Sequence, residues 1–78
     1  MSNQKKITVY TKPNCVQCNA TYRSLDQLKI EYNVVDLTQD QEAMKLVLSL
    51  GHKSAPIVVT ETDNWSGFRP DKIQALAQ

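Results

Sequence analysis

The chain has 78 residues, 41% of them hydrophobic, and a formal net charge of +1. A chain of this length builds one small core, which argues against a second domain or a large multi-site enzyme and predicts a single domain over residues 1–78. Nine Lys and Arg residues against eight Asp and Glu leave no basic excess, so the charge argues against nucleic acid as a partner.

The first predicted elements are a strand and a helix. Residues 7–10 are β-branched or aromatic and are followed by a polar, proline-containing stretch, which predicts a strand that ends there. Asn14 and Gln17 stand at N-cap and N3 spacing, a variant of the capping box, which places Cys15 at the first helical position. Apolar side chains recur at helical spacing after it, so the helix is expected to run over about residues 15–29.

A second strand and a second helix follow. Residues 32–37 form the strand, and because it is reached through a helix, it is expected to pair parallel to the first strand through a right-handed crossover. Thr38 and Gln41 again have capping-box spacing and predict a helix that continues to Leu50. Gly51 then supplies the stop.

The last part of the chain predicts a hairpin and a helix. Residues 57–60 and 64–66 flank a short polar connection suited to an antiparallel hairpin. Pro70 fits the first turn of a final helix, where Asp71 complements the positive end of the helix dipole. The order β-α-β-α-β-β-α predicts an α/β fold with a four-stranded mixed sheet and three helices.

The first residues of the chain indicate the cellular compartment in which we expect the protein. Residues 1–6 lead directly into the first strand without the apolar region or cleavage site of a signal peptide. No apolar run approaches the roughly 20 residues of a membrane span. We therefore expect a cytoplasmic protein with no membrane partner, in a reducing compartment where a disulfide is transient and catalytic.

The two cysteines carry the clearest chemical signal. Bridging Cys15 to Cys18 closes a loop of about four residues, too short to staple a core, but residues i and i+3 of a helix lie close enough for their sulfurs to bond. Free backbone N–H groups and the helix dipole favour a thiolate at Cys15, the predicted nucleophile. Cys18, one turn further on the apolar stripe, is the predicted resolving thiol of a thiol–disulfide exchange reaction.

A metal site is the main alternative, since two cysteines at this spacing form half of a zinc knuckle. His52 is the only histidine and no second cysteine pair exists, so the sequence offers no obvious set of four ligands. We expect no metal. An inert cysteine pair is the remaining alternative.

Several neighbours of the dithiol have two interpretations. Lys12 either stabilises the thiolate or steers an acidic partner, or it is a solvated loop residue. The first strand contains no carboxylate, so solvent or a partner must take the proton of Cys18. Pro56, preceded by Ala55 at the head of a β-branched run, is a candidate cis-proline.

The single Trp and the single Phe lie close together near the end of the chain. Trp65 and Phe68 bracket Ser66 and Gly67, and they belong either to the core or to a contact surface. Gly67 permits a turn that holds this loop near the active site. Arg69 either meets a partner carboxylate or is a solvated surface charge.

The order of elements, the dithiol at the start of a helix and the proline at the head of the third strand together resemble the thioredoxin fold, and the small size resembles glutaredoxins within it. Two motifs are more specific. The stretch Cys15–Cys18 (CVQC), followed by Ala20 and Thr21, and the stretch 65–71 (WSGFRPD) resemble the NrdH-redoxin family of bacterial glutaredoxin-like proteins. The resemblance covers nearly the whole chain.

This resemblance implies a monomeric protein disulfide reductase that donates electrons to a class Ib ribonucleotide reductase in deoxyribonucleotide synthesis. It binds no cofactor and is re-reduced by thioredoxin reductase with NADPH. The resemblance also implies that Pro56 is the cis-proline beside the dithiol and that Ala55 offers backbone hydrogen bonds to a partner strand. Ser54 and Ala55 depart from the usual family pattern. The expected partner-binding residues are Lys12, Val16, Gln17, Ala55, Pro56, Trp65, Ser66, Gly67, Phe68 and Arg69.

Three other functions remain open. A glutathione-dependent glutaredoxin fits the size and fold, but residues 65–71 replace the Gly-Gly-Asp-type segment with which glutaredoxins hold a glutathione carboxylate. An iron–sulfur carrier would take Cys15 from each of two chains. A regulatory module would sense oxidation through the dithiol without turning over.

Overall fold

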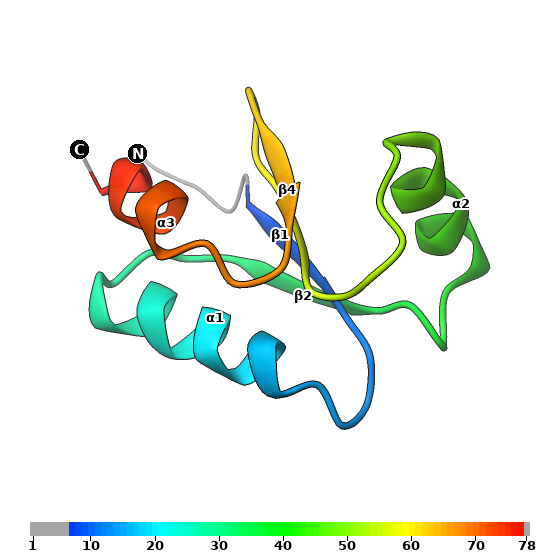
Figure 1. Ribbon diagram of the computed structural model, residues 1–78, viewed down its shortest axis with the longest axis horizontal. Coiled ribbons are helices and arrows are strands. Elements are labelled where there is room, and N and C mark those ends of the chain that lie inside the picture. Colours follow the sequence, from blue (N-terminus) through cyan, green and yellow to red (C-terminus); the bar gives the residue numbers. More distant parts are fainter. Residues whose placement is uncertain (1–6, 78) are drawn as a thin grey trace.

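The computed structural model describes residues 7–77, which form four strands and three helices (Figure 1). The elements in chain order are β1 (Thr8–Thr11), α1 (Val16–Gln27), β2 (Asn33–Asp36), α2 (Gln41–Ser49), β3 (Ile57–Val59), β4 (Asn64–Ser66) and α3 (Pro70–Leu76). The predicted order is confirmed, and every strand end lies within one residue of its predicted place. No helix in this part of the chain is long and apolar enough to cross a bilayer.

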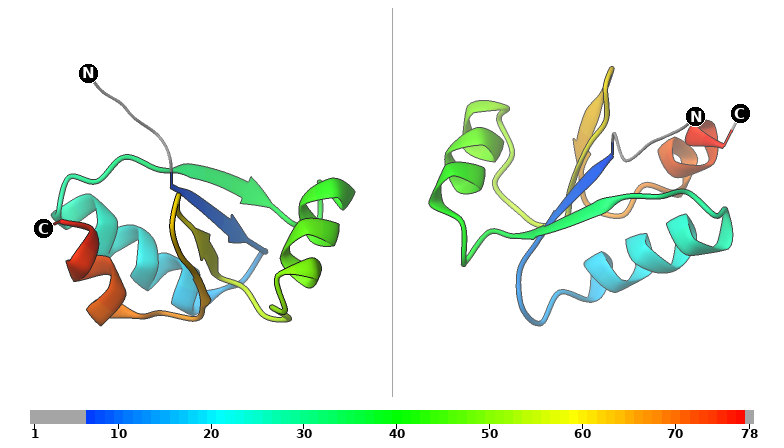
Figure 2. Two further views of the ribbon diagram at one scale, coloured as in Figure 1. Left: turned by 90° about the horizontal axis from the view of Figure 1, so that it is seen from above. Right: turned by 180° about the vertical axis from the view of Figure 1, so that it is seen from behind.

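The strands are ordered β2-β1-β3-β4 in a mixed sheet. The predicted parallel pairing of β1 with β2 is confirmed, and β3 pairs antiparallel with both β1 and β4. One row of the register runs from Val34 through Val9 and Val58 to Trp65. Helices α1 and α3 cover one face of the sheet and α2 lies on the other, as the view from above shows (Figure 2).

Two apolar clusters fill the spaces on either side of the sheet, because successive residues of a strand point to opposite faces. The cluster under α1 and α3 consists of Val9, Leu25, Val58, Trp65 and Ile73. The cluster on the α2 side consists of Tyr10, Leu37, Ala43, Val47 and Ile57. Trp65 is only 4% exposed, so of its two interpretations the core position is confirmed.

The predicted start of α1 is wrong by one residue. Cys15, rather than Asn14, is the N-cap: its backbone is extended, with φ −107° and ψ 104°, and its sulfur accepts a hydrogen bond from the N–H of Cys18. Asn14 has φ +60°, in the left-handed region that few residues other than glycine adopt. It therefore turns the chain into the helix instead of capping it.

Helix α1 also ends earlier than predicted, at Gln27 instead of about Lys29. Lys29 has φ +59°, its N–H bonds the Asp26 carbonyl, and the next N–H, of Ile30, bonds the Leu25 carbonyl. This is the Schellman arrangement, in which a left-handed residue reverses the chain and satisfies the last carbonyls.

The N-cap of α2 is Asp40, not Thr38. The Asp40 carboxylate accepts a hydrogen bond of 3.0 Å from the N–H of Ala43. Thr38 is engaged elsewhere, because its N–H and its hydroxyl both donate to the Asp36 carboxylate. The predicted stop is confirmed: Gly51 has φ +91° and closes the same Schellman arrangement as Lys29.

Candidate active site

The disulfide between Cys15 and Cys18 lies at the N-terminal end of α1, with the two Cα atoms 5.2 Å apart. The loop before β3 and the loop after β4 reach the same end of the sheet. They are joined by a hydrogen bond of 2.8 Å from the N–H of Gly67 to the carbonyl of Pro56. Three segments that are distant in sequence therefore surround the dithiol.

The sulfur of Cys15 is itself the capping atom of the helix. It accepts a hydrogen bond of 3.1 Å from the N–H of Cys18, the place that a Ser or Asp oxygen takes in an ordinary N-cap. The four N–H groups of a helix's first turn have no partner within the helix, and its dipole is positive at this end. Negative charge on this sulfur is therefore favoured by the backbone alone.

Cys18 is 1% exposed, so its predicted shielding from solvent is confirmed. It shares the buried side of α1 with Thr21 and Leu25. Thr21 is fully buried, and its hydroxyl donates to the carbonyl of Gln17 at 2.9 Å, so no polar atom of that side chain is left without a partner. The sulfur of Cys18 consequently sits against the core, whereas Cys15 is half-buried at the surface.

The peptide bond between Ala55 and Pro56 is cis, as predicted. Pro56 is buried at the head of β3, and Ala55 is half-buried. The bond from Gly67 uses the Pro56 carbonyl, while Ser54 before them is exposed. The departure of Ser54 and Ala55 from the family pattern thus leaves the proline arrangement intact.

The side chain of Gln17 makes a hydrogen bond that its local sequence does not predict. Its side-chain oxygen accepts a hydrogen bond of 3.0 Å from the N–H of Phe68. Gly67 makes this approach possible, because it has φ +83° and a Cβ placed there would lie 3.3 Å from the same oxygen. The loop after β4 is thereby held directly against the turn of the dithiol.

The remaining predicted contact residues are spread around this centre. Val16, between the cysteines, is 82% exposed, an unusual value for a large aliphatic side chain. Ser66 is exposed and Phe68 half-buried. Lys12 is exposed and lines both the pocket beside the disulfide and a second pocket against α2.

Arg69 meets a carboxylate of its own chain. Its guanidinium donates two hydrogen bonds, of 3.2 and 3.0 Å, to Asp71. These bonds raise the pKa of Arg69 and lower the pKa of Asp71. Asp63 is paired in the same way with Lys72 at 2.9 Å, and the hydrogen bond from Lys72 is the main cause of the lowered Asp63 pKa.

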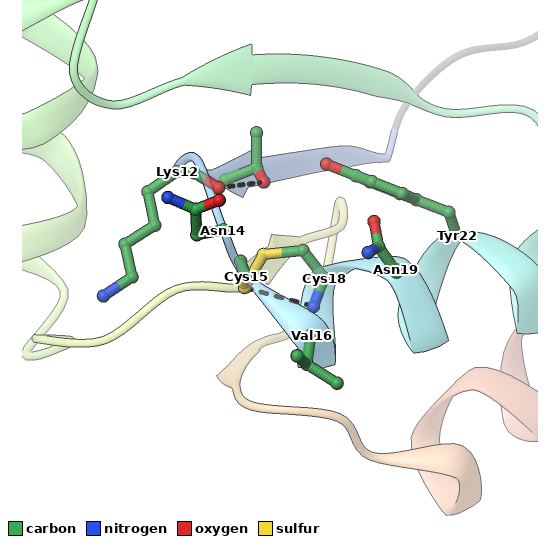
Figure 3. Close-up of a pocket in the computed structure, with 8 residues that line it drawn as sticks. Lys12, Asn14, Cys15, Val16, Cys18, Asn19 and Tyr22 are labelled. Carbon is green, nitrogen blue, oxygen red and sulfur yellow. Dashed lines mark hydrogen bonds between the residues drawn. A yellow bond between two sulfur atoms is a disulfide. The ribbon is translucent and has the colours of Figure 1, made fainter.

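Beside the disulfide lies an open pocket of about 470 Å³ (Figure 3). It is bordered by both cysteines and by a mainly polar set of side chains from β1, the following loop and α1. They are Thr11, Lys12, Asn14, Cys15, Val16, Cys18, Asn19 and Tyr22. Asn19 and Tyr22 were not among the predicted site residues; the available signal was that each lies four residues, about one helical turn, after one of the cysteines.

Behind this pocket two tyrosines are stacked. The rings of Tyr22 and Tyr32 lie 5.9 Å apart at an angle of 3°, and the Tyr32 hydroxyl donates to Asp26 at 3.0 Å. Desolvation, followed by the contact with Asp26, raises the pKa of Tyr32 to about 12. The stack fixes the position of the Tyr22 ring at the edge of the pocket.

The acids and the histidine are dispersed. Within residues 7–77 no group of three or more His, Cys, Asp and Glu side chains is placed to hold a metal ion. His52 instead contacts Asn64 on β4, with 2.6 Å between its Nε2 and the amide oxygen. Neither partner of this contact was a predicted site residue.

A four-stranded thioredoxin-type sheet, a disulfide at the start of the first helix and a cis-proline at the head of β3 define a thiol–disulfide oxidoreductase. The glutaredoxin family model matches residues 7–63. The glutaredoxin-like protein NrdH of Escherichia coli is 35% identical over 71 residues, which cover 91% of this chain and 88% of that protein. The chain belongs to the NrdH glutaredoxin-like family and carries its redox pair at Cys15 and Cys18.

Two further comparisons extend over nearly the full length of both chains. The glutaredoxin-like protein NrdH of Lactococcus lactis is 32% identical, with 91% of this chain and 99% of that protein covered. The solved structure of NrdH-redoxin from Escherichia coli superimposes with a TM-score of 0.86 at 36% identity, covering 90% of this chain and 92% of that one. The predicted thioredoxin/glutaredoxin fold is therefore confirmed.

Proposed function

We propose that this protein is the electron donor of a class Ib ribonucleotide reductase and that thioredoxin reductase re-reduces it with electrons from NADPH in the cytoplasm. The hydrogen bond between Phe68 and Gln17 is the observation that carries the proposal. It holds the 65–71 segment beside the turn of the dithiol, and the family resemblance implies that this segment replaces the glutathione-holding segment of glutaredoxins. The Escherichia coli NrdH-redoxin, similar in structure, is described as having a thioredoxin-like activity profile.

In the proposed mechanism Cys15 is the nucleophile. Its thiolate is stabilised by the N–H of Cys18 and by the positive end of α1, and it attacks one sulfur of the partner disulfide. A mixed disulfide forms between Cys15 and that sulfur, and the other partner sulfur leaves as a thiolate.

Cys18 then resolves the mixed disulfide. Its thiol loses a proton, and the resulting thiolate attacks the sulfur of Cys15. The Cys15–Cys18 bond forms, the second partner sulfur leaves as a thiolate, and two electrons have passed from the dithiol to the partner. The structure holds the oxidised product of this sequence.

The exposed groups around the disulfide suit a protein partner. Val16 offers an apolar contact beside the nucleophile, and Ala55, before the cis-proline, is the proposed place for backbone hydrogen bonds to an extended partner segment. Phe68 is an aromatic anchor of the kind enriched in interfaces. Lys12 and Arg69 are the exposed cations near the site, although Arg69 is already paired with Asp71.

The donor test decides between the proposed function and its runner-up. The oxidised protein is mixed with NADPH and thioredoxin reductase, or with glutathione, NADPH and glutathione reductase, and thiol formation is followed by alkylation and mass analysis. Rapid reduction in the first mixture only is the expected result, with Cys18→Ser, which cannot form the internal disulfide, as the control. Efficient reduction by glutathione alone would establish a glutathione-dependent glutaredoxin instead.

A second assay addresses the acceptor. The reduced protein is supplied as the sole dithiol to a class Ib ribonucleotide reductase, and deoxyribonucleotide formation is measured. Turnover that continues as long as NADPH and thioredoxin reductase are present is expected. An iron–sulfur carrier would instead give a coloured, iron-containing protein after purification under anaerobic conditions.

A further inference from the structure

The proposed mechanism requires a group that exchanges a proton with Cys18. Cys18 must lose a proton before it attacks and regain one when the disulfide is reduced, yet its side chain is 1% exposed. None of the side chains that border the adjoining pocket is an acid or a histidine. A buried carboxylate therefore does not serve this sulfur from within the pocket.

The pocket itself supplies a route for water. It opens to solvent, holds about 470 Å³, and reaches both Cys18 and the polar side chains of Asn14, Asn19 and Tyr22. A water needs two or more polar partners to be held in place, and this pocket is large enough for several. In Figure 3 the Tyr22 ring extends from α1 with its hydroxyl end above the disulfide, and Asn19 stands between that ring and Cys18.

These polar side chains are also available. Within residues 7–77 no protein group forms a hydrogen bond with the side chain of Asn14, Asn19 or Tyr22. Asn14 and Asn19 are exposed and Tyr22 is half-buried, and all three border the pocket. The Tyr22 ring is fixed from behind by its stack on Tyr32. A fixed hydroxyl orients water more effectively than a mobile one, because less rotational freedom is lost on binding.

We propose that Asn19 and Tyr22 are positioning residues that hold water beside Cys18 and so provide the proton path of the resolving step. The Cys18 thiol gives its proton to this water, and the thiolate then forms the bond to Cys15 while the partner thiolate leaves. In the reverse direction the same water returns the proton. The inference rests on the proposed role of Cys18 as the resolving thiol.

The other ionisable groups near the pocket are few. Lys12 borders it, and Asp26 lies behind the tyrosine stack through its bond to Tyr32. Asp36 is opposite Thr11 in the register of β1 and β2, but it accepts hydrogen bonds from Thr38 and does not border the pocket. Asp36 is the competing proton acceptor that an experiment must separate from water.

The test resolves the two chemical steps. Reduced protein is mixed with one equivalent of dithiobis-nitrobenzoate in a stopped-flow instrument between pH 5 and 8. The first coloured thiolate reports attack by Cys15, and the second reports resolution by Cys18. The variants are Tyr22→Phe, Asn19→Leu and their combination. Tyr10→Phe and Gln27→Leu are the controls, because they remove a tyrosine hydroxyl and a side-chain amide at residues that do not border the pocket.

In the double variant we expect the second phase to slow by about tenfold or more at neutral pH, which is less than the roughly 10²–10⁴-fold contribution of a positioned acid or base, because bulk water still reaches the open pocket. The first phase should stay within about twofold of the wild type, and the pH profile of the second phase should shift upward, since desolvation disfavours the Cys18 thiolate. The control variants should leave both phases unchanged. A structural defect would slow both phases together and would be visible in thermal unfolding.

Three results would overturn the inference. A second phase that stays within about twofold in the double variant would show that the pocket is not the proton path, given the size of proton-transfer effects. Slowing by Asp36→Asn with no effect of the pocket variants would assign the role to that carboxylate. Equal slowing of both phases would reduce Asn19 and Tyr22 to structural residues. If the proposed roles of Cys15 as nucleophile and Cys18 as resolving thiol were wrong, Cys15→Ser would retain the first phase. That result can be told apart from a failure of the inference about the pocket.

Discussion

The N–H of Phe68 donates a hydrogen bond of 3.0 Å to the side-chain oxygen of Gln17, the residue that precedes Cys18 and lies 51 positions earlier in the chain. This bond ties the loop after β4 to the turn that carries the dithiol. Because Gly67 also bonds the Pro56 carbonyl, the proline loop belongs to the same connected unit. The redox pair is thus set in place by two distant loops as well as by its own helix.

Removing the oxygen of Gln17 should loosen this unit. We expect Gln17→Met, which keeps the length of the side chain, to lower the free energy of unfolding by about 0.5–1.5 kcal/mol, the net contribution of one hydrogen bond. Urea unfolding measures the change. Gln27→Met is the control, since Gln27 is also exposed and lies on the same helix. Equal losses in the two variants would contradict a structural role for the bond to Phe68.

Substitutions of the two glycines distinguish the cost of a left-handed backbone from the cost of steric crowding. Gly51 and Gly67 both have positive φ, but a Cβ at Gly51 meets nothing within 4 Å, whereas at Gly67 it meets the Gln17 oxygen at 3.3 Å. Each Gly→Ala change should cost about 1–2 kcal/mol for the left-handed conformation. Gly67→Ala should cost more than Gly51→Ala, as measured by chemical unfolding. The opposite order would show that the loop after β4 adapts without strain.

Lys29 offers a stabilising substitution. It occupies the left-handed position after α1 that Gly51 occupies after α2. Lys29→Gly should raise the free energy of unfolding by about 0.5–1 kcal/mol, because relief of the left-handed penalty exceeds the entropy that glycine adds to the unfolded chain. Lys29→Ala removes the charge but keeps the conformational penalty, so it should not stabilise. Thermal and urea unfolding should agree.

The two cysteine variants should differ in kind. Cys18→Ser keeps the nucleophile and removes the resolving thiol, so we expect it to accumulate a mixed disulfide with partner proteins. Cys15→Ser lacks the attacking thiol and should be inactive in exchange. Non-reducing electrophoresis and mass analysis of the trapped species check both. The reverse pattern would exchange the proposed roles.

The ion pair between Asp63 and Lys72 predicts a dependence on pH. The pKa of Asp63 is lowered from 3.8, so the folded state binds its proton less tightly than the unfolded chain does. The stability from this pair is fully present above the unfolded pKa and is lost as the pH falls through the folded pKa. The stability difference between the wild type and Asp63→Asn should therefore shrink below pH 3.8.

Salt provides the check on that prediction. The pair is partly exposed, so high ionic strength at neutral pH should shrink the same difference. A difference that is constant from neutral to strongly acidic pH would show that the charge of Asp63 does not stabilise the fold through this pair, since asparagine keeps an oxygen that can still accept from the N–H of Asn64.

Local sequence patterns predicted the elements and the redox pair well, because periodicity, turn residues and the spacing of Cys15 and Cys18 are short-range signals. They misplaced the starts of α1 and α2. Asn14 is a strong N-cap residue by propensity, but its left-handed backbone leaves that place to a cysteine sulfur. Thr38 has capping-box spacing, but its hydroxyl donates a hydrogen bond to the Asp36 carboxylate instead of capping the helix.

Contacts between residues that are distant in the sequence could not be predicted from these local patterns. The bond between Gln17 and Phe68 joins residues 51 positions apart, and nothing in either local sequence specifies the other. The pocket that Asn19 and Tyr22 border depends likewise on how β1 lies against α1. Such features follow from tertiary packing, which a single sequence does not encode in a local, periodic form.

The atom that caps α1 is also the atom that is proposed to attack. Any substitution of Cys15 therefore changes the start of a helix as well as the chemistry. Serine retains an oxygen that can accept from the same N–H, whereas alanine leaves the first turn without its cap. For preparing an inactive protein that still presents its partner surface, serine is the replacement that preserves the shape of the molecule.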